Sequence, residues 1–431
     1  MKKSFVFPRG TSDILPEETS IWCALESQAR KLLRNYGYCE IRTPLFEETN
    51  LFARSVGQTS DIVQKQMLNL AAQGAQTDAE DIQSGSLSLR PEGTASIVRS
   101  YIQHNLARKE KLSKLFYIGP MFRGERPQKG RLRQFHQIGV EAIGAGSASS
   151  YLDAEVIALS VNLLKDFGVT DFVLKINTLG SIEDKVQFAE YLKDKLSDQV
   201  DHLCPDCQNR YGRNIFRLLD CKNKACQKII HQIEFDFSYL SQESRDYYTV
   251  VKAALDILGI AYQEDPCLVR GLDYYTHVVF ELCCDKLGSQ NALGAGGRYN
   301  CLVEQLGGPQ VDAIGFALGM ERILLASSQE SIQLNDRLDA FVVALGDEAF
   351  LKAFQLLFAL RSNQISADMR FSGDSLKSQM RQANKVNARN VVILGQEEIE
   401  RGVIVVKNMD EGNQDEVPLE DIQQLMIKLR T

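Results

Sequence analysis

The spacing of apolar and polar positions divides the chain into helices and strands. Apolar side chains recur at helical spacing over 21–36, and Gly37 follows them, which predicts a first helix that ends near residue 36. Short runs rich in β-branched and aromatic residues predict strands at 115–118, 172–176 and 278–282. Because strands and helices do not alternate regularly before about residue 325, the pattern favours an α+β fold with an antiparallel sheet.

The pattern changes after residue 338, where strand-like and helical segments alternate. We predict strands at 341–345, 391–395 and 403–406, and helices at 347–361 and near 419–430. Two domains are therefore expected, joined through the polar stretch 327–331. The first spans 1–325 and contains a mostly helical insertion at about 180–250, and the second is an α/β domain at 335–431.

Composition and charge exclude several classes of protein. The 431 residues are 44% hydrophobic and 24% charged, which excludes a disordered, collagen-like or coiled-coil chain. A net charge of −7 argues against a protein that coats nucleic acid or an anionic membrane. No apolar run approaches the ~18 residues of a membrane span, and the N-terminal segment lacks the apolar core of a signal peptide. We therefore expect a cytoplasmic protein without membrane contact, whose ten cysteines are not paired in disulfides.

Basic residues are concentrated at 99–133, which carries ten Lys or Arg against two Glu. This local charge of +8 leaves −15 for the remainder of the chain. The segment 123–133 contains Gly and Pro and lies between two strand-like runs, so we predict a hairpin loop there. Guanidinium groups that project from such a loop are suited to bidentate contact with phosphate.

A second basic feature lies in the C-terminal domain. Lys377, Arg381, Lys385 and Arg389 recur every fourth residue, and no acidic residue occurs from 375 to 396. If 375–389 is helical, the four form one basic stripe, in which like charges repel one another unless a polyanion binds. We favour nucleic-acid contact over the alternative, a solvated helix face.

Several common motifs are absent from the sequence. There is no Gly-x-x-x-x-Gly-Lys-Ser/Thr phosphate loop, and residues 294–299 (GAGGRY) do not have the Gly-x-Gly-x-x-Gly spacing of a dinucleotide site. The five histidines include no His-Glu-x-x-His zinc motif. If a nucleotide binds, arginines must therefore hold it.

Three segments resemble the motifs that define class II aminoacyl-tRNA synthetases. Residues 36–45 (YGYCEIRTPL) resemble motif 1, which builds the dimer interface in that class. Residues 122–125 (FRGE) resemble motif 2, and residues 315–322 (GFALGMER) resemble motif 3, a strand–helix unit that ends in an ATP-binding arginine. The order and spacing of the three segments make this resemblance specific.

Further runs narrow the resemblance to the histidyl-tRNA synthetases. They are 89–94 (LRPEGT), 134–141 (QFHQIGVE), 270–276 (RGLDYYT), 294–299 (GAGGRY) and, near the C-terminus, 375–380 (SLKSQM). The resemblance covers essentially the whole chain. It implies a class II catalytic domain with an antiparallel sheet and a helical insertion, followed by an α/β anticodon-binding domain. One departure is Asn300, where that family usually has Asp, and this change affects the expected local hydrogen bonding.

The resemblance implies a histidine–tRNA ligase that acts as a homodimer. Such an enzyme uses ATP, as its Mg²⁺ complex, to convert L-histidine to histidyl-adenylate, and then transfers histidine to tRNA(His). Fixed cations are expected to stabilise the charge on the phosphoryl oxygens. By resemblance, Arg123 grips the α-phosphate, and Arg270 contacts both the histidine carboxylate and the α-phosphate. The expected ATP-binding residues are Arg123, Glu125, Arg131 and Arg322.

The histidine-binding residues follow from the same motifs. The expected set is Glu92, Gly93, Thr94, Gln137, Glu141, Arg270, Tyr274 and Tyr275. Acceptors among them suit the ammonium group of histidine, while Glu141 and Tyr275 can bracket the two ring nitrogens. Taken alone, Glu92 can equally be a carboxylate at a helix terminus and Tyr274 a core aromatic residue. His136 is interpreted as structural because the sequence shows no partner for it.

The motif 2 loop at 124–134 is expected to approach the acceptor stem of the tRNA, and the basic stripe to lie in the domain that meets the anticodon. An alternative is a catalytically silent, synthetase-like regulatory subunit of histidine biosynthesis. Such proteins lack the anticodon-binding domain and lose catalytic positions, whereas Arg123, Arg270 and Arg322 are present here. A class II ligase for another amino acid is disfavoured by the run 270–276.

Four cysteines in the helical insertion have a spacing near that of a zinc ribbon. Cys204 and Cys207 are followed after thirteen residues by Cys221 and Cys226. Two such pairs can supply four thiolates to a structural zinc ion. We favour four reduced thiols and no metal, because the second spacing is loose and the family is not defined by a metal.

Overall fold

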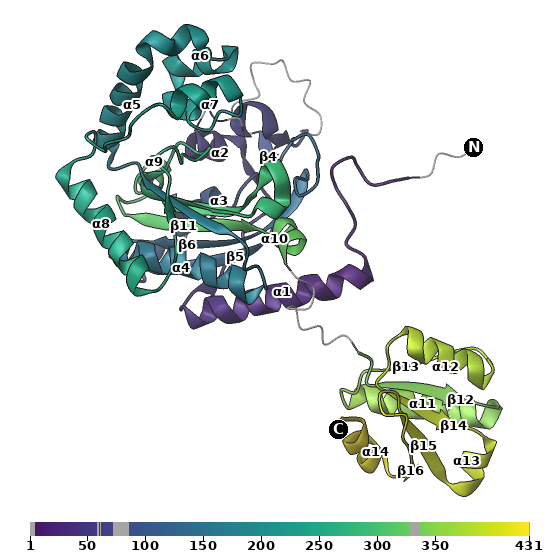
Figure 1. Cartoon of the computed structure of the whole chain (residues 1–431). Helices are drawn as coiled ribbons and strands as arrows, with labels where there is room; N and C mark the ends of the chain where they lie inside the picture. Colours follow the sequence, from purple (N-terminus) through teal and green to yellow (C-terminus); the bar gives the residue numbers. More distant parts are fainter. Residues whose placement is uncertain (1–4, 58–59, 61, 72–85, 328–336, 431) are drawn as a thin grey trace. The chain divides into compact units, whose positions relative to one another are not determined.

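The computed structural model describes residues 5–57, 60, 62–71, 86–327 and 337–430. The chain divides into two compact units, Met1–Gln333 and Leu334–Thr431 (Figure 1). Most of the polar stretch 327–331 lies outside the described residues. Within the described ranges, every helix is too short or too polar to cross a membrane.

The first unit is built around an eight-stranded sheet with the strand order β1-β5-β6-β11-β10-β9-β7-β8. Neighbouring strands from β5 to β7 pair antiparallel, and the two short edge strands pair parallel, which confirms the predicted antiparallel sheet. The strands are β1 (Cys39–Glu40), β5 (Ser113–Phe122), β6 (Gln134–Ile143), β7 (Val173–Thr178), β8 (Gln263–Glu264), β9 (Thr276–Cys283), β10 (Ala292–Arg298) and β11 (Ala313–Gly319).

Helix α1 (Pro16–Asn35) forms where the apolar spacing predicts it. A proline occupies the first turn, where backbone N–H groups have no acceptor within the helix, so its missing N–H costs no hydrogen bond. The two glutamates that follow it interact favourably with the positive end of the helix dipole. Gly37 follows with a φ of 80°, a left-handed conformation that ends helices. The buried side of α1 packs in one core with α4 (Ser150–Asp166) and α8 (Gln242–Ile257), and α1 and α4 lie along the same side of the sheet in Figure 1.

A second core covers the opposite side of β5. Phe116 belongs to the α4 core, whereas Leu115 and Tyr117 belong to the second core, as the alternation of side chains along a strand requires. The second core includes the helical block α5 (Ile182–Leu196), α6 (Pro205–Arg213) and α7 (Lys224–Ile230), which Figure 1 shows together at one end of the unit. The remaining elements are β2 (Phe46–Glu48), α2 (Thr49–Val56), β3 (Leu68–Asn69), β4 (Leu87–Leu89), α3 (Thr94–Gln103), α9 (Leu302–Gln305) and α10 (Met320–Ala326).

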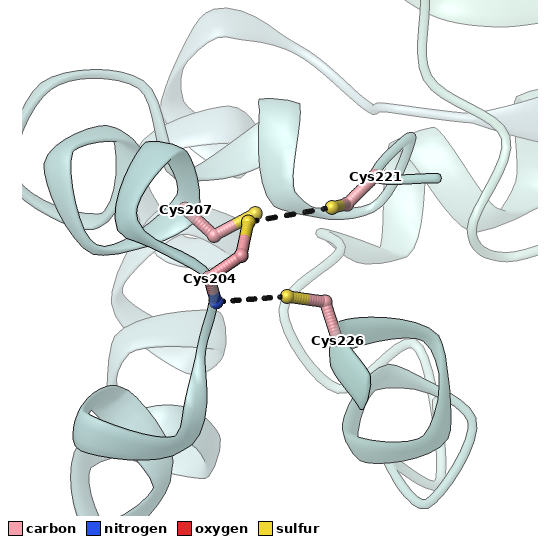
Figure 2. Close-up of side chains that lie close together, drawn as sticks. All are labelled: Cys204, Cys207, Cys221 and Cys226. Carbon is pink, nitrogen blue, oxygen red and sulfur yellow. Dashed lines mark hydrogen bonds between the residues drawn. The ribbon is translucent and has the colours of Figure 1, made fainter. Parts of the chain in front are cut away.

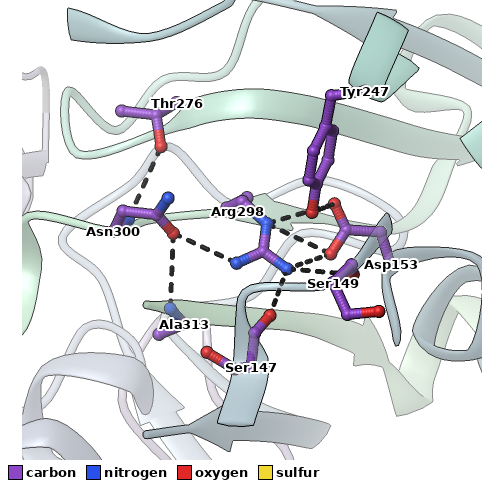
Figure 3. Close-up of polar contacts among 8 residues, drawn as sticks. All are labelled: Ser147, Ser149, Asp153, Tyr247, Thr276, Arg298, Asn300 and Ala313. Carbon is purple, nitrogen blue, oxygen red and sulfur yellow. Dashed lines mark hydrogen bonds and ion pairs between the residues drawn. The ribbon is translucent and has the colours of Figure 1, made fainter. Parts of the chain in front are cut away.

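A buried ion pair joins the end of β10 to α4 (Figure 3). The side chains of Arg298 and Asp153 are 1% and 0% exposed, and Arg298 also donates to the carbonyl oxygen of Ser147 at 2.7 Å. The side-chain oxygen of Asn300 accepts hydrogen bonds from Arg298 Nη1 at 3.2 Å and from the backbone N–H of Ala313 at 3.4 Å. The side-chain oxygen of Asn300 thus accepts the hydrogen bonds that an aspartate oxygen would accept. The charge that the amide lacks is not needed for Arg298, because Asp153 already neutralises that arginine.

The second unit contains a five-stranded sheet with the order β13-β12-β14-β15-β16. The first three strands pair parallel and the last two antiparallel. Val342 and Phe341 on the interior strand β12 (Ala340–Ala344) point into separate cores on opposite faces, so helices cover both faces as in an α/β domain. Its elements are β12 (Ala340–Ala344), α11 (Asp347–Ser362), β13 (Ala367–Met369), α12 (Leu376–Lys385), β14 (Asn390–Leu394), α13 (Gln396–Arg401), β15 (Val403–Asn408), β16 (Gln414–Pro418) and α14 (Ile422–Arg430).

The basic helix is shorter than the four-residue stripe requires. Helix α12 ends at Lys385, and Asn387 adopts a left-handed conformation with a φ of 51°. The N–H of Ala388 then donates to the carbonyl oxygen of Ala383 at 3.0 Å, which closes the last turn. Arg389 therefore lies beyond the helix. The α12 basic face consists of three exposed residues, Lys377, Arg381 and Lys385.

Candidate active site

A polar cavity of about 280 Å³ opens in the first unit, beside the β5–β6 hairpin and strands β10 and β11. Segments from residue 92 to residue 322 contribute to its wall, so the fold brings together motifs that are far apart in sequence. Ten of the twelve expected histidine- and ATP-binding residues line it: Glu92, Thr94, Arg123, Glu125, Arg131, Gln137, Arg270, Tyr274, Tyr275 and Arg322.

Glu92 lies at one end of this cavity and at the N-terminus of α3. Its carboxylate oxygens accept hydrogen bonds from the backbone N–H groups of Thr94 and Ala95, both at 2.8 Å. Glu92 is therefore both a carboxylate at a helix N-terminus and a residue of the cavity wall, so the two interpretations of its sequence position do not exclude each other. Burial raises the pKa of Glu92, although the two backbone hydrogen bonds and the charge of Arg123 oppose the shift.

Glu141 and Gly93 are the two expected residues that lie behind the wall. The hydroxyl of Thr94 donates to Glu141 Oε1 at 2.6 Å, and the hydroxyl of Tyr299 donates to Oε2. Burial raises the pKa of Glu141 to about 8. Gly93 makes room for an aromatic ring, because a Cβ atom there would come within 2.2 Å of Tyr117 Cζ.

Two tyrosines that line the cavity were not among the expected residues. Tyr117 lies on β5, and Tyr299 follows β10. Tyr117 belongs to the apolar run 115–118, so hydrophobic spacing alone assigns its ring to the core, whereas Tyr299 lies between Arg298 and Asn300 and carries no such signal. Tyr299 nevertheless stands inside the run 294–299, which is the one sequence signal that pointed to it.

Arg131 and Arg322 lie at the other end of the cavity, and Arg123 lies between them and Glu92. Arg123 donates to the carbonyl oxygen of Pro91 at 2.9 Å, and its guanidinium lies 5.1 Å from the centre of the Phe135 ring. Arg322 donates to Gly130 O at 2.9 Å and to Ala292 O at 2.5 Å, while Arg131 is paired with Glu125. Burial lowers the pKa of Arg123 to about 10, so this arginine remains a cation at neutral pH.

The predicted hairpin loop forms and carries two of these groups. Strands β5 and β6 flank residues 123–133, and Gln128 and Arg131 exchange backbone hydrogen bonds of 3.0 and 2.9 Å across the turn. Gly130 has a φ of 71°, a conformation that suits glycine. The turn places Gly130 O where Arg322 can donate to it, so the loop and α10 are joined at the arginine end of the cavity.

Arg270 forms an ion pair with Glu281 on β9. Burial acts against its charge, but Glu281 more than offsets this and raises the pKa of Arg270. Its Nε atom is buried without a hydrogen-bond partner, and the same holds for Gln137 Oε1 and Tyr117 Oη.

Positively and negatively charged side chains are concentrated in different parts of the cavity. Arg322 interacts electrostatically with Arg131 and Arg123, whereas Glu141 interacts with Glu92. The arginine end can neutralise a polyphosphate, and the carboxylate end can pair with an ammonium group. Arg123 interacts with both Glu92 and Arg131, so it lies between the two ends. The arrangement can hold a nucleotide and a small amino compound side by side.

Comparison with known proteins identifies the family. A sequence model described as histidyl-tRNA synthetase matches residues 10–323, and one described as an anticodon binding domain matches residues 339–429. The chain belongs to the histidyl-tRNA synthetase family. A relative from Moorella thermoacetica, named histidine–tRNA ligase, is 47% identical over 96% of this chain and 95% of its own length. A relative of the same name from Halothermothrix orenii is 44% identical over 98% and 99%.

A solved structure of a histidyl-tRNA synthetase has the same fold. The crystal structure of the apo Staphylococcus aureus enzyme superposes with a TM-score of 0.80 at 39% identity, covering 98% of this chain and 100% of that one. Membership of the histidyl-tRNA synthetase family confirms the α+β class II catalytic domain and the anticodon-binding domain that the motifs predict.

His136 has a partner that the sequence did not reveal. Its backbone N–H donates to Glu321 Oε1 at 2.9 Å, and its Nδ1 atom lies 2.9 Å from the same oxygen. The ring also packs edge-on against Trp22, with a centroid distance of 4.9 Å. Glu321 belongs to the motif 3 run of this synthetase family, so His136 links β6 and α1 to α10.

Proposed function

We propose that this chain is a histidine–tRNA ligase. Its first reaction joins L-histidine to the α-phosphate of ATP, supplied as the Mg²⁺ complex, and releases pyrophosphate. Its second reaction transfers the histidyl group from the adenylate to the terminal ribose of tRNA(His). The observation that carries the proposal is the single cavity in which Arg123, Arg270 and Arg322 face Glu92 and Tyr275.

The arginines are assigned to the phosphates. In adenylate formation the histidine carboxylate attacks the α-phosphorus, the bond to pyrophosphate breaks, and two anions must approach each other. Arg123 and Arg270 are assigned to opposite sides of the α-phosphate, where they stabilise the charge that develops on its oxygens. Arg131 and Glu125 orient the nucleotide, and Arg322 binds the γ-phosphate end.

The carboxylate end of the cavity is assigned to histidine. Glu92, Thr94 and Gln137 accept hydrogen bonds from its ammonium group, and Tyr274 lies beside the pocket. Tyr275 is assigned to one ring nitrogen. Glu141 lies behind the wall, so it is assigned to the other nitrogen indirectly, through Thr94 and Tyr299, which line the cavity and donate to its two oxygens. A pocket that pairs both ring nitrogens excludes apolar analogues.

Exchange of labelled pyrophosphate into ATP tests the proposed first reaction directly. We expect exchange that depends on L-histidine and is absent with the other amino acids, because only histidine pairs all the polar groups of the pocket. Aminoacylation of tRNA(His) measured in parallel tests the second reaction. Failure of histidine to support exchange, or equal exchange with a different amino acid, would refute the proposal.

Binding of the tRNA is assigned to two basic regions. The 123–133 loop is proposed to meet the acceptor stem, and the α12 basic face to meet the anticodon arm. The fourth residue of the expected set, Arg389, lies beyond the end of α12, where its backbone N–H donates to Leu338 O at 2.7 Å. We therefore expect the three residues on the helix to contribute most to binding.

Reversal of one charge on the α12 basic face tests this assignment. We expect Arg381→Glu to weaken tRNA binding and to flatten its dependence on salt, because fewer counterions are released from the RNA. Filter binding at several salt concentrations measures both effects. Lys352→Glu on α11 is the matched control, because it makes the same charge change on another helix of the unit. An unchanged salt slope in Arg381→Glu would refute the role of this face.

A silent regulatory subunit is the weaker alternative. Residues 339–429 match the anticodon binding domain, and the catalytic arginines line the cavity. We also propose that the enzyme is a homodimer built through the motif 1 segment. The side chains of Leu45 and Phe46, at the end of that segment, are 42% and 48% exposed, which is unusual for adjacent large apolar residues and suits an interface.

A further inference from the structure

The four cysteines of the helical block converge on one point (Figure 2). Cys204 precedes α6, Cys207 lies in its first turn, Cys221 lies in the turn before α7, and Cys226 is on α7. Their sulfur atoms all lie within 4.8 Å of one another. A zinc ion with Zn–S bonds of ~2.3 Å in a tetrahedron places its sulfurs about 3.8 Å apart. The pair Cys204 and Cys221, at 3.9 Å, already has this separation.

Two of the four sulfurs accept hydrogen bonds from backbone N–H groups. The backbone N–H of Cys204 donates to Cys226 Sγ at 3.2 Å, and the N–H of Asn223 donates to Cys221 Sγ at 3.4 Å. Three of the four side chains are buried. Four thiolates around one divalent ion carry a net charge of −2, and backbone N–H donors are the groups that stabilise such a charge.

Reduced thiols and a disulfide explain this arrangement less well. Small apolar thiols have no reason to gather at one point, because each would gain as much by packing against the surrounding side chains. A disulfide has a sulfur separation of about 2.05 Å, whereas all four cysteines are free in the structure. The mutual approach of all four sulfurs is the feature that the sequence spacing did not reveal.

We propose that Cys204, Cys207, Cys221 and Cys226 form a structural site for one zinc ion. Four protein ligands leave no open position, so the ion has no catalytic role of its own. It would join the start of α6 to α7 through their connecting turn. A block of short helices with few apolar residues would then be held together by metal–ligand bonds in addition to its core.

This block contacts the segment that carries Arg270 and the two pocket tyrosines. Asn214, which follows α6, donates to Asp273 Oδ1 at 2.9 Å, and Arg217 donates to Gly271 O at 3.3 Å. Lys185 on α5 donates to Tyr275 O at 2.8 Å. We therefore extend the proposal to a positioning role, in which the metal-bound block holds residues 270–275 in place. This extension rests on the proposed histidine–tRNA ligase function.

Metal analysis of the purified full-length chain tests the site itself. We expect about one zinc ion per chain, and tetrahedral thiolate absorption bands when cobalt(II) replaces zinc. Cys207→Ser is expected to lose both, and Cys23→Ser, which changes an exposed cysteine outside the cluster, is expected to retain both. If Cys207→Ser does not fold, the cobalt(II) spectrum of the wild type alone decides whether the four thiolates bind a metal ion. A reduced wild-type chain that takes up neither zinc nor cobalt would overturn the site.

The positioning role has a separate test. Asn214→Ala is expected to retain zinc and the wild-type melting temperature while raising the KM for histidine about tenfold and leaving the KM for ATP unchanged. Removal of zinc with a chelator is expected to raise the same KM, and added zinc to restore it. Unchanged kinetics in both experiments would overturn the positioning role. Absence of histidine-dependent exchange in the zinc-loaded wild type would instead refute the proposed function.

Discussion

Arg270→Ala is expected to lower the rate of histidine-dependent pyrophosphate exchange by about 10³-fold, because a fixed cation is lost where charge develops. The substitution also leaves Glu281 without its ion-pair partner at the edge of the cavity, which adds repulsion toward an incoming phosphate. Binding of tRNA should remain nearly unchanged, since the α12 basic face belongs to the other unit. Steady-state exchange and filter binding measure the two quantities separately.

Two further variants make this result interpretable. Arg126→Ala removes an exposed arginine from the 123–133 loop and should leave exchange within a few fold of the wild type. Arg270→Lys keeps the charge but loses the planar fork, so its exchange rate should lie between those of the alanine variant and the wild type. Equal losses of exchange and of tRNA binding in Arg270→Ala would show that the residue supports the fold and is not part of the catalytic chemistry.

Glu141→Gln should reduce kcat/KM for histidine by about 10²-fold or more. The variant keeps the size of the side chain but replaces one oxygen by an NH2 group, which cannot accept the hydrogen bond from Thr94 or Tyr299 that a carboxyl oxygen accepts in either protonation state. The KM for ATP should change little, since the arginine end is untouched. Glu155→Gln is the matched control because Glu155 pairs with Lys114 outside the cavity. Equal effects on both KM values would contradict the assignment of Glu141 to histidine.

We also expect Glu141→Gln to become more stable relative to the wild type as the pH rises. Burial raises the pKa of Glu141 from 4.5 to about 8. Between these two pH values the unfolded chain has released this proton and the folded chain still holds it, so the contribution of Glu141 to stability declines as pH rises. Glu141→Gln has no proton to release there. Its melting temperature should therefore rise relative to the wild type from about pH 5 to about pH 8, as measured by calorimetry.

The charged residues of the cavity were the ones that could be predicted from sequence, because they stand in recognisable motifs. Arg123, Arg270 and Arg322 stand in motifs that are polar where a core strand would be apolar, and all three line the cavity. Tyr117 was missed for the opposite reason, because a tyrosine fits the apolar rhythm of a strand as well as it fits a binding site. Glu281 was missed because its role depends on the fold bringing β9 beside Arg270.

Element boundaries show a similar division. Strands β5, β7 and β9 and helix α1 follow from their apolar side chains, whereas β16 was not predicted because its residues are exposed except Val417. Such polar edge strands lack the signal on which sequence prediction depends, although the same polarity protects the edge from pairing with another chain. The early end of α12 depends on the conformation of Asn387, which amino-acid type alone does not determine.

Two glycines that do not line the cavity set the position of a ring that does, that of Tyr117. On β6, Gly139 pairs with Tyr117 in register, and a Cβ atom at Gly139 would come within 2.0 Å of Tyr117 Cζ, much as one at Gly93 would. The ring can occupy its place only because both neighbours lack a side chain. A methyl group at either glycine would displace the ring. The width of the cavity beside Tyr117 therefore depends on two glycine positions outside the lining.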